Sequence, residues 1–179
     1  LVLLVFRLMW GVYGGHWSRF SNFIPSVKAS LVYLRQPGAW QLPGHSPLAA
    51  WSVWAMLIVL LLQVASGLCA DDDAGFSGPL SAWVSSYSVE LFTYYHADIG
   101  KWLLFALIGL HLGAVLFQVF YRRQDLLRAM WSGYRWWPLG NPERSSDDAR
   151  QRLKALVIFS LSTALVLTGI YVLQTTVNS

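Results

Sequence analysis

The sequence is poor in charged residues and in cysteine. Only 12% of its 179 residues are charged and 55% are hydrophobic, whereas roughly 25% of the residues of a soluble domain are charged. So few charges could not cover the surface of a soluble globular protein, and that class is excluded. The single cysteine excludes a disulfide framework and any zinc or iron–sulfur site built from several thiolates. Twenty-seven aromatic residues, ten Trp, eight Tyr and nine Phe, exclude disorder.

Long apolar runs are what the sequence has in abundance. A helix needs about 20 mostly apolar residues to cross a bilayer, because lipid offers no partner for backbone polar groups. Three runs are long enough and a fourth looks like half a span: Ala49–Leu68, Ile99–Phe120, Ala155–Leu173 and Leu1–Val12. The sequence therefore predicts an all-α integral membrane helical bundle. Because the chain opens inside an apolar run, we expect residues upstream of Leu1 to be missing. The stretch Trp83–Tyr95 is too polar to span, and we expect it at the membrane surface.

The loops between these spans alternate in charge. The loop before Ala49 carries Arg19, Lys28 and Arg35 without an acid. The next loop has no Lys or Arg and contains five acids: Asp71, Asp72, Asp73, Glu90 and Asp98. Eight basic residues against four acids follow Phe120. The positive-inside rule predicts that loops 13–48 and 121–154 are cytoplasmic and that loop 69–95 is periplasmic. Orientation in the membrane thus accounts for the net charge of +4, and we expect no nucleic-acid partner.

Two of the four histidines, His96 and His111, belong to one predicted span. Ionisable residues inside a membrane helix are costly and usually mark a functional site. Fifteen residues at about 100° each leave the two rings about 60° apart in direction, so both can face one side of the helix. A rise of about 1.5 Å per residue separates them by about 22 Å along the axis. This spacing suits two sites at different depths and not one zinc site, whose ligands usually sit at i and i+4.

The helix side between the histidines suits a flat macrocycle. It carries Gly100, Leu103, Leu104, Leu107, Ala114 and Gln118. Small side chains at positions 100 and 114 leave room for a porphyrin, and haem iron takes neutral imidazole as an axial ligand. Gly109 and Gly113 point elsewhere and form a small-xxx-small pair that lets a neighbouring helix pack closely. The alternative is that the histidines hydrogen-bond to other helices or relay protons.

The other two histidines lie in the first basic loop. Neither reaches the depth of His111 easily, because that residue lies about nine residues, or roughly 13 Å, from its helix end. We expect His45 to cap or position the following helix. His16 is expected to be a surface residue.

Several segments resemble the bacterial cytochrome b-561 family, which is similar to the cytochrome b subunits of nickel–iron hydrogenases and formate dehydrogenases. They are Phe6–Gly14, Arg19–Ser21, Gly44–Leu48, Gly67–Asp73, Gly78–Leu80, the span with His96 and His111, and Arg128–Gly133. The resemblance covers residues 1–137, which would form the membrane domain without its first helix and part of its second. Residues 138–154 would be a basic cytoplasmic linker and 155–174 an additional C-terminal transmembrane helix.

The resemblance implies a four-helix membrane bundle that holds two haem b groups in the full-length protein. One histidine for each haem maps onto His96 and His111, and the partner axial histidines are expected upstream of residue 1. Arg7 is a candidate for a haem propionate, with a snorkelling anchor as the alternative. Lys101 has the same two options at the outer haem.

Together these observations predict a b-type cytochrome of the bacterial inner membrane. It would transfer electrons between membrane quinone or quinol and a periplasmic or membrane redox partner, such as a c-type cytochrome or a dehydrogenase. The acidic loop would attract a basic soluble carrier. A cofactor-free anchor or proton-relay subunit is the alternative, and the sequence leaves open whether the protein is an enzyme such as a quinol oxidase.

Overall fold

The computed structural model is an all-α bundle of long apolar helices. It describes residues 1–24, 26–35, 46–72, 75–121, 123, 131 and 148–177. Three described helical segments are long and apolar enough to cross a membrane, and the 12-residue helix α1 (Val2–Tyr13) is a shorter apolar one. The three predicted complete spans are therefore confirmed as helices of spanning length, and the opening apolar run is a helix.

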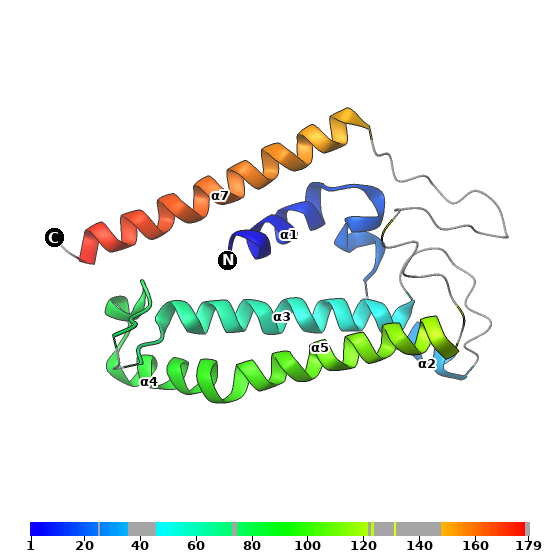
Figure 1. The fold of residues 1–179 in the computed structure, drawn as a ribbon, viewed down its shortest axis with the longest axis horizontal. Helices are drawn as coiled ribbons and strands as arrows, with labels where there is room; N and C mark the ends of the chain where they lie inside the picture. Colours follow the sequence, from blue (N-terminus) through cyan, green and yellow to red (C-terminus); the bar gives the residue numbers. More distant parts are fainter. Residues whose placement is uncertain are drawn as a thin grey trace.

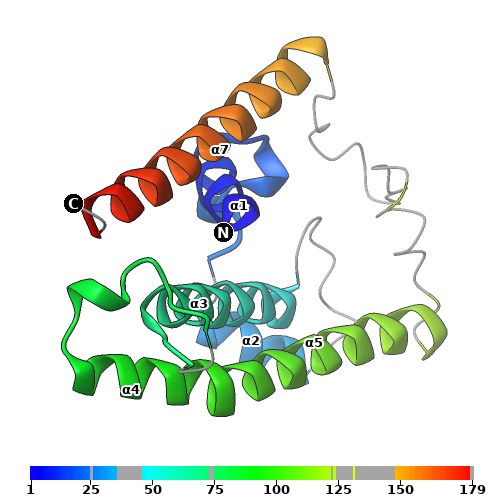
Figure 2. The ribbon, with the colours of Figure 1, turned by 60° about the vertical axis from the view of Figure 1, so that its left-hand side comes forward.

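The helices associate in two pairs. Helix α1 packs against α7 (Ala149–Val177), and α3 (Pro47–Cys69) packs against the long segment that contains α5 (Lys101–Leu116). Figures 1 and 2 show the two pairs in separate parts of the bundle. Ser162 of α7 has no exposed surface, and its Oγ lies 3.3 Å from Sδ of Met9 in α1. A small residue at this point lets the two helices approach closely.

The second pair contains one continuous helical segment, Ser86–Tyr121. It comprises α4 (Ser86–Tyr94), the π-helical turn η5 (Tyr95–Gly100), α5, and a second π-helical turn, η6 (Phe117–Tyr121). The polar stretch before Tyr95, predicted to lie apart at the membrane surface, is largely the beginning of this helix, and α4 packs on α3. Tertiary contacts thus outweigh its modest hydropathy.

Helix starts are set by short polar side chains. Oγ of Ser46 accepts a hydrogen bond from the Ala49 N–H and Pro47 follows it, which is the usual start of a helix. Asp148 begins α7 in the same way, with Oδ1 accepting from the Gln151 N–H at 2.8 Å. The cap of α3 is therefore Ser46. His45, which we expected in a capping or positioning role, lies outside the described residues.

The described helix ends fall into two groups (Figure 1). The end of α1, the start of α3, the end of η6 and the start of α7 lie at one end of the bundle, together with the short helix α2 (Val27–Arg35). The other end holds the loop after α3, which begins at Ala70. This loop contains the 3-10 turn η4 (Ser81–Trp83) and folds back on α3, where the Leu80 N–H donates to the Leu68 carbonyl at 2.8 Å. The described parts of the basic segments thus lie at one end, and the described part of the acidic loop lies at the other.

Most large apolar side chains are exposed in the described structure. Only a few apolar residues are buried, among them Ala50, Val59, Ile158 and Val166. Bulky residues such as Trp102, Phe105 and Leu110 face outward with more than half of their surface accessible. Outward apolar faces on helices of spanning length are what a lipid environment requires.

Candidate functional site

His96 lies in the π-helical turn η5, and its ring faces helix α3. Nδ1 of the ring is 2.9 Å from the backbone carbonyl oxygen of Gln63 and 3.4 Å from Oγ of Ser66. A carbonyl oxygen can only accept, so Nδ1 carries the hydrogen and donates it. In the neutral ring, Nε2 then holds the lone pair. A hydrogen bond of this kind fixes the tautomer and ring direction of a metal-binding histidine.

Two glycines let α3 and η5 come this close. A Cβ on Gly67 would lie 2.6 Å from Cε1 and 3.0 Å from Nδ1 of His96, closer than real Cβ contacts. A Cβ on Gly100, which is buried, would overlap the side-chain oxygen of Gln63. Small side chains at both positions are therefore a geometric condition for the His96 contact with α3.

The Gln63 side chain adds a second bond to the same turn. Its Nε2 donates to the backbone carbonyl of His96 at 2.9 Å. A π-helical turn departs from the regular i→i−4 ladder, and such turns often occur at functional sites. Gln63 therefore holds His96 twice, through its backbone carbonyl to the ring and through its amide to the main chain. Oε1 of Gln63 and the hydroxyl of Tyr95 are buried and have no hydrogen-bond partner among the described residues.

His111 lies farther along the same helix and also faces α3. Its Nδ1 is 3.3 Å from Oγ of Ser52, a hydroxyl that can donate or accept. The ring is half-buried, as is that of His96. Within the described ranges, Nε2 of neither ring makes a hydrogen bond. Each imidazole thus has one nitrogen held by α3 and the other available as a ligand.

The contacts on α3 show how far apart the two rings are. Ser52 precedes Gln63 by eleven residues and Ser66 by fourteen. At about 1.5 Å per residue, the partners of the two rings are roughly 17–21 Å apart along α3. The rings therefore occupy two depths of the bundle, too far apart to bind one metal ion. The described residues contain no group of three or more His, Cys, Asp or Glu side chains that could hold a metal ion. A porphyrin supplies the equatorial ligands itself, so a haem iron needs only axial imidazoles and no cluster of this kind.

The helix side between the histidines agrees in part with the predicted stripe. Leu104, Leu107 and Gln118 are half-buried like His111, whereas Leu103 and Ala114 are exposed. The expected close packing at Gly109 and Gly113 has no counterpart in the described ranges. A Cβ on either glycine would meet no atom within 4 Å.

The Arg7 side chain turns toward the chain that follows α1. Its guanidinium donates to the Ser18 carbonyl at 3.2 Å and lies 4.9 Å from the centre of the Phe20 ring. These contacts order the loop after α1 and use part of a group with five N–H donors. The remaining N–H donors could still bind a haem propionate, so this role of Arg7 stays a prediction.

Lys101, at the start of α5, is exposed. Its Nζ lies 5.7 Å from the centre of the Trp102 ring, a cation–π arrangement. The side chain sits five residues from His96, and both of its predicted roles stay open. His16 is exposed against Trp17, as expected of a surface residue.

Sequence reasoning missed the α3 residues that hold the two histidines. Ser52, Gln63, Ser66 and Gly67 stand in a span that is otherwise almost wholly apolar. Polar and small side chains in membrane helices often mark contacts with a neighbouring helix. Their presence in an apolar span was the sequence signal that could have predicted this contact.

Comparison with known proteins gives one family. The model of the family described as Prokaryotic cytochrome b561 matches residues 1–133. The match includes α1, α3 and the whole helical segment that carries His96 and His111, whereas α7 follows it. A search of curated proteins and a search of solved structures each found no match.

Proposed function

The chain belongs to the prokaryotic cytochrome b561 family, and from this membership we propose how it moves electrons. The family makes it a multi-pass bacterial membrane protein, a b-type cytochrome that binds haem b and transfers electrons. We propose that it holds two haem b groups in the full-length protein, one ligated by His96 and the other by His111. The partner axial histidines in this proposal come from residues before Leu1.

The observation that carries the proposal is the state of the two imidazoles. Both have Nδ1 within hydrogen-bond reach of α3, and both leave Nε2 without a partner in the part of the chain that the structure describes. An imidazole held in this way offers the lone pair of Nε2 to a metal ion in a fixed orientation. At His96 this arrangement supports haem ligation over the proton-relay alternative, since the Nδ1 hydrogen is bonded to the Gln63 backbone carbonyl, which cannot pass it on as a base.

Bound haem would supply the one-electron redox couple, and the chain supplies ligands, orientation and an apolar environment. The Gln63 and Ser52 contacts hold the imidazoles at two depths. The half-buried Leu104 and Leu107 give the helix an apolar face between those depths. Lys101 and Arg7 are proposed to meet haem propionates at the outer and inner site, respectively.

We further propose the electron partners and the orientation. Membrane quinone or quinol would exchange electrons with a periplasmic or membrane redox partner, such as a c-type cytochrome or a dehydrogenase. The protein would lie in the inner membrane with its basic loops in the cytoplasm and its acidic loop in the periplasm. The exposed carboxylates of Asp72, Glu90 and Asp98 at the acidic end support docking of a basic carrier.

The test is a count of haems in histidine variants of the full-length protein. His96→Ala and His111→Ala should each reduce the haem content from two per protein to one, measured as pyridine haemochrome. His16→Ala is the matched control, because this exposed histidine has no place in the proposed sites, and it should keep both haems. Two haems in both test variants would show that the ligands lie elsewhere. Quinol-driven reduction, with and without a soluble cytochrome c, then separates an electron carrier from an oxidase that passes electrons to oxygen.

A further inference from the structure

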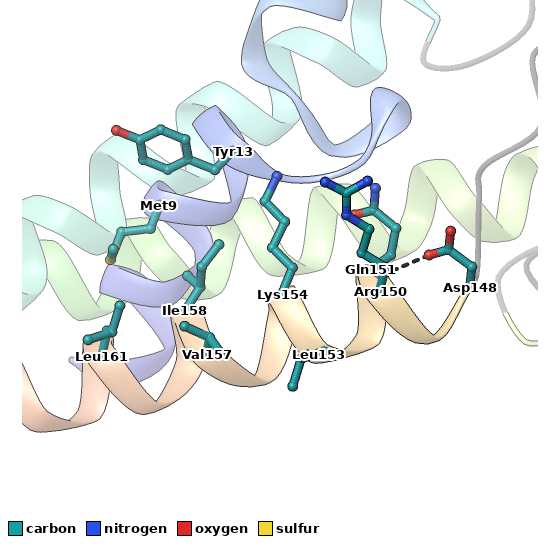
Figure 3. Close-up of a pocket in the computed structure, with 10 residues that line it drawn as sticks. All are labelled: Met9, Tyr13, Asp148, Arg150, Gln151, Leu153, Lys154, Val157, Ile158 and Leu161. Carbon is teal, nitrogen blue, oxygen red and sulfur yellow. Dashed lines mark hydrogen bonds between the residues drawn. The ribbon is translucent and has the colours of Figure 1, made fainter.

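A cavity of about 700 Å³ lies between α1 and the first turns of α7. This volume is within the range of ligand-binding pockets. We propose that it binds the phosphate headgroup and the upper acyl chain of an anionic phospholipid. The cavity lies at the end of the bundle where α7 starts (Figures 1 and 3), and neither His96 nor His111 lines it.

The lining changes from cationic to apolar along one face of α7. Arg150, Lys154, Val157 and Leu161 all line the cavity, at successive spacings of four, three and four residues. These spacings place them on one side of an α-helix. The cations come first, at the helix start, and the apolar residues follow deeper in the span (Figure 3). A phospholipid has the same order, from its phosphate to its acyl chain.

Helix α1 supplies the opposite wall of the cavity. Tyr13 and Met9 line the cavity four residues apart, hence on one face of the helix. Tyr13 ends α1, and its ring extends toward the Met9 side, away from the cations at the start of α7 (Figure 3). The Tyr13 ring and the Met9 thioether therefore give this wall a largely apolar surface, which suits an acyl chain.

The two cations are available for a phosphate. Arg150 and Lys154 are exposed and make no ion pair or side-chain hydrogen bond with the described residues. Asp148, the acid in the lining, uses Oδ1 to cap the start of α7. Oε1 of Gln151, also in the lining, is buried without a partner among the described residues, and a headgroup hydroxyl or ammonium would satisfy it. Basic pockets between transmembrane helices are typical sites for anionic lipid headgroups.

The experiment measures lipid binding to the delipidated full-length protein in mild detergent by native mass spectrometry. Phosphatidylglycerol is titrated as the anionic probe and phosphatidylethanolamine as the zwitterionic one, with inorganic phosphate and a quinone as competitors. Arg150→Gln combined with Lys154→Gln should weaken phosphatidylglycerol binding roughly 30-fold if each cation acts as it does at a membrane surface. The control, Lys28→Gln with Arg35→Gln, removes the same charge from exposed positions of α2 at the same end and should change binding less than about twofold.

Four results would overturn the proposal. One is equal phosphatidylglycerol affinity in the double variant and the wild type, and another is equal affinity for the two phospholipids. Displacement of the lipid by inorganic phosphate alone would show a free-phosphate site. Displacement by the uncharged quinone would show a quinone groove. Because both cations are exposed, the variants should fold, and an unchanged haem absorbance spectrum would verify this.

Discussion

Replacing Gly67 by alanine would put a methyl group where the edge of the His96 ring now lies. The added carbon would stand 2.6 Å from Cε1, 3.0 Å from Nδ1 and 3.3 Å from Nε2 of the ring. Ordinary contact begins at 3.4 Å, so the ring or α3 must shift by about 0.8 Å at the closest atom. The shift strains the Nδ1 bond to the Gln63 carbonyl and changes the direction of Nε2, the nitrogen proposed to bind haem iron.

The expected magnitude follows from the cost of overpacking a fitted contact. Such insertions cost about 1–3 kcal/mol, which corresponds to roughly 5- to 150-fold weaker binding of the haem that His96 is proposed to ligate. The assay is a haem titration of the apo protein in detergent, followed by pyridine haemochrome counts and a redox titration. Gly67→Ala should weaken one of the two sites and leave the other intact.

Gly113→Ala is the matched control on the long helix. It adds the same methyl group where no atom lies within 4 Å in the described structure, and it should keep both sites at wild-type affinity. Full haem content, an unchanged absorbance spectrum and unchanged midpoint potentials in Gly67→Ala would refute the argument that this glycine sets the position of His96.

Three further predictions concern the Gln63 contact with His96, the acidic loop and the α1–α7 helix pair. Gln63→Leu removes the amide that donates to the His96 carbonyl, so the free energy of unfolding should fall by about 1–3 kcal/mol. The midpoint potential of one haem should also shift. Thermal unfolding followed by haem absorbance and a redox titration test this, and unaltered stability and potential would contradict it. Asp71→Asn with Asp72→Asn should slow association with a basic c-type cytochrome and reduce the salt dependence of the rate; stopped-flow traces identical to wild type at low ionic strength would exclude this loop as the docking surface. Ser162→Leu should lower the free energy of unfolding by about 1–3 kcal/mol, because the fully buried site against Met9 has no room for the larger side chain. Ser162→Ala should lower it by about 1 kcal/mol. Equal melting temperatures for the two variants would show that the α1–α7 contact is loose.

The spans could be predicted from the sequence because hydropathy and length decide them almost alone. The beginning of the long helix could not. Ser86–Tyr94 is polar enough to look like a surface segment, and it becomes part of the helix through packing on α3. Thr93 contributes to this, because its Oγ1 bonds with both the N–H and the carbonyl of Asp71. Contacts between segments so distant in sequence leave no local pattern.

The spacing of the histidines predicted a common direction, and both rings do contact α3. The prediction assumed an unbroken α-helix, whereas η5 interposes a π-helical turn that no 3.6-residue periodicity reveals. The predicted helix contact at Gly109 and Gly113 is not seen among the described residues. Gly109 and Gly113 match a familiar motif, yet the close approaches in the described structure occur at Gly67 and Gly100. A glycine in the sequence indicates a close helix contact only when the atoms that face it are known.

The bonds between Thr93 and Asp71 fasten the acidic loop to the helix one turn before His96. Three residues, or about 4.5 Å of helix rise, separate this fastening from the ligand position. A redox protein that docked on the loop as proposed would therefore contact the same segment that positions His96, the proposed ligand of the outer haem. Binding of that partner would be coupled, through Thr93, to the position of this imidazole.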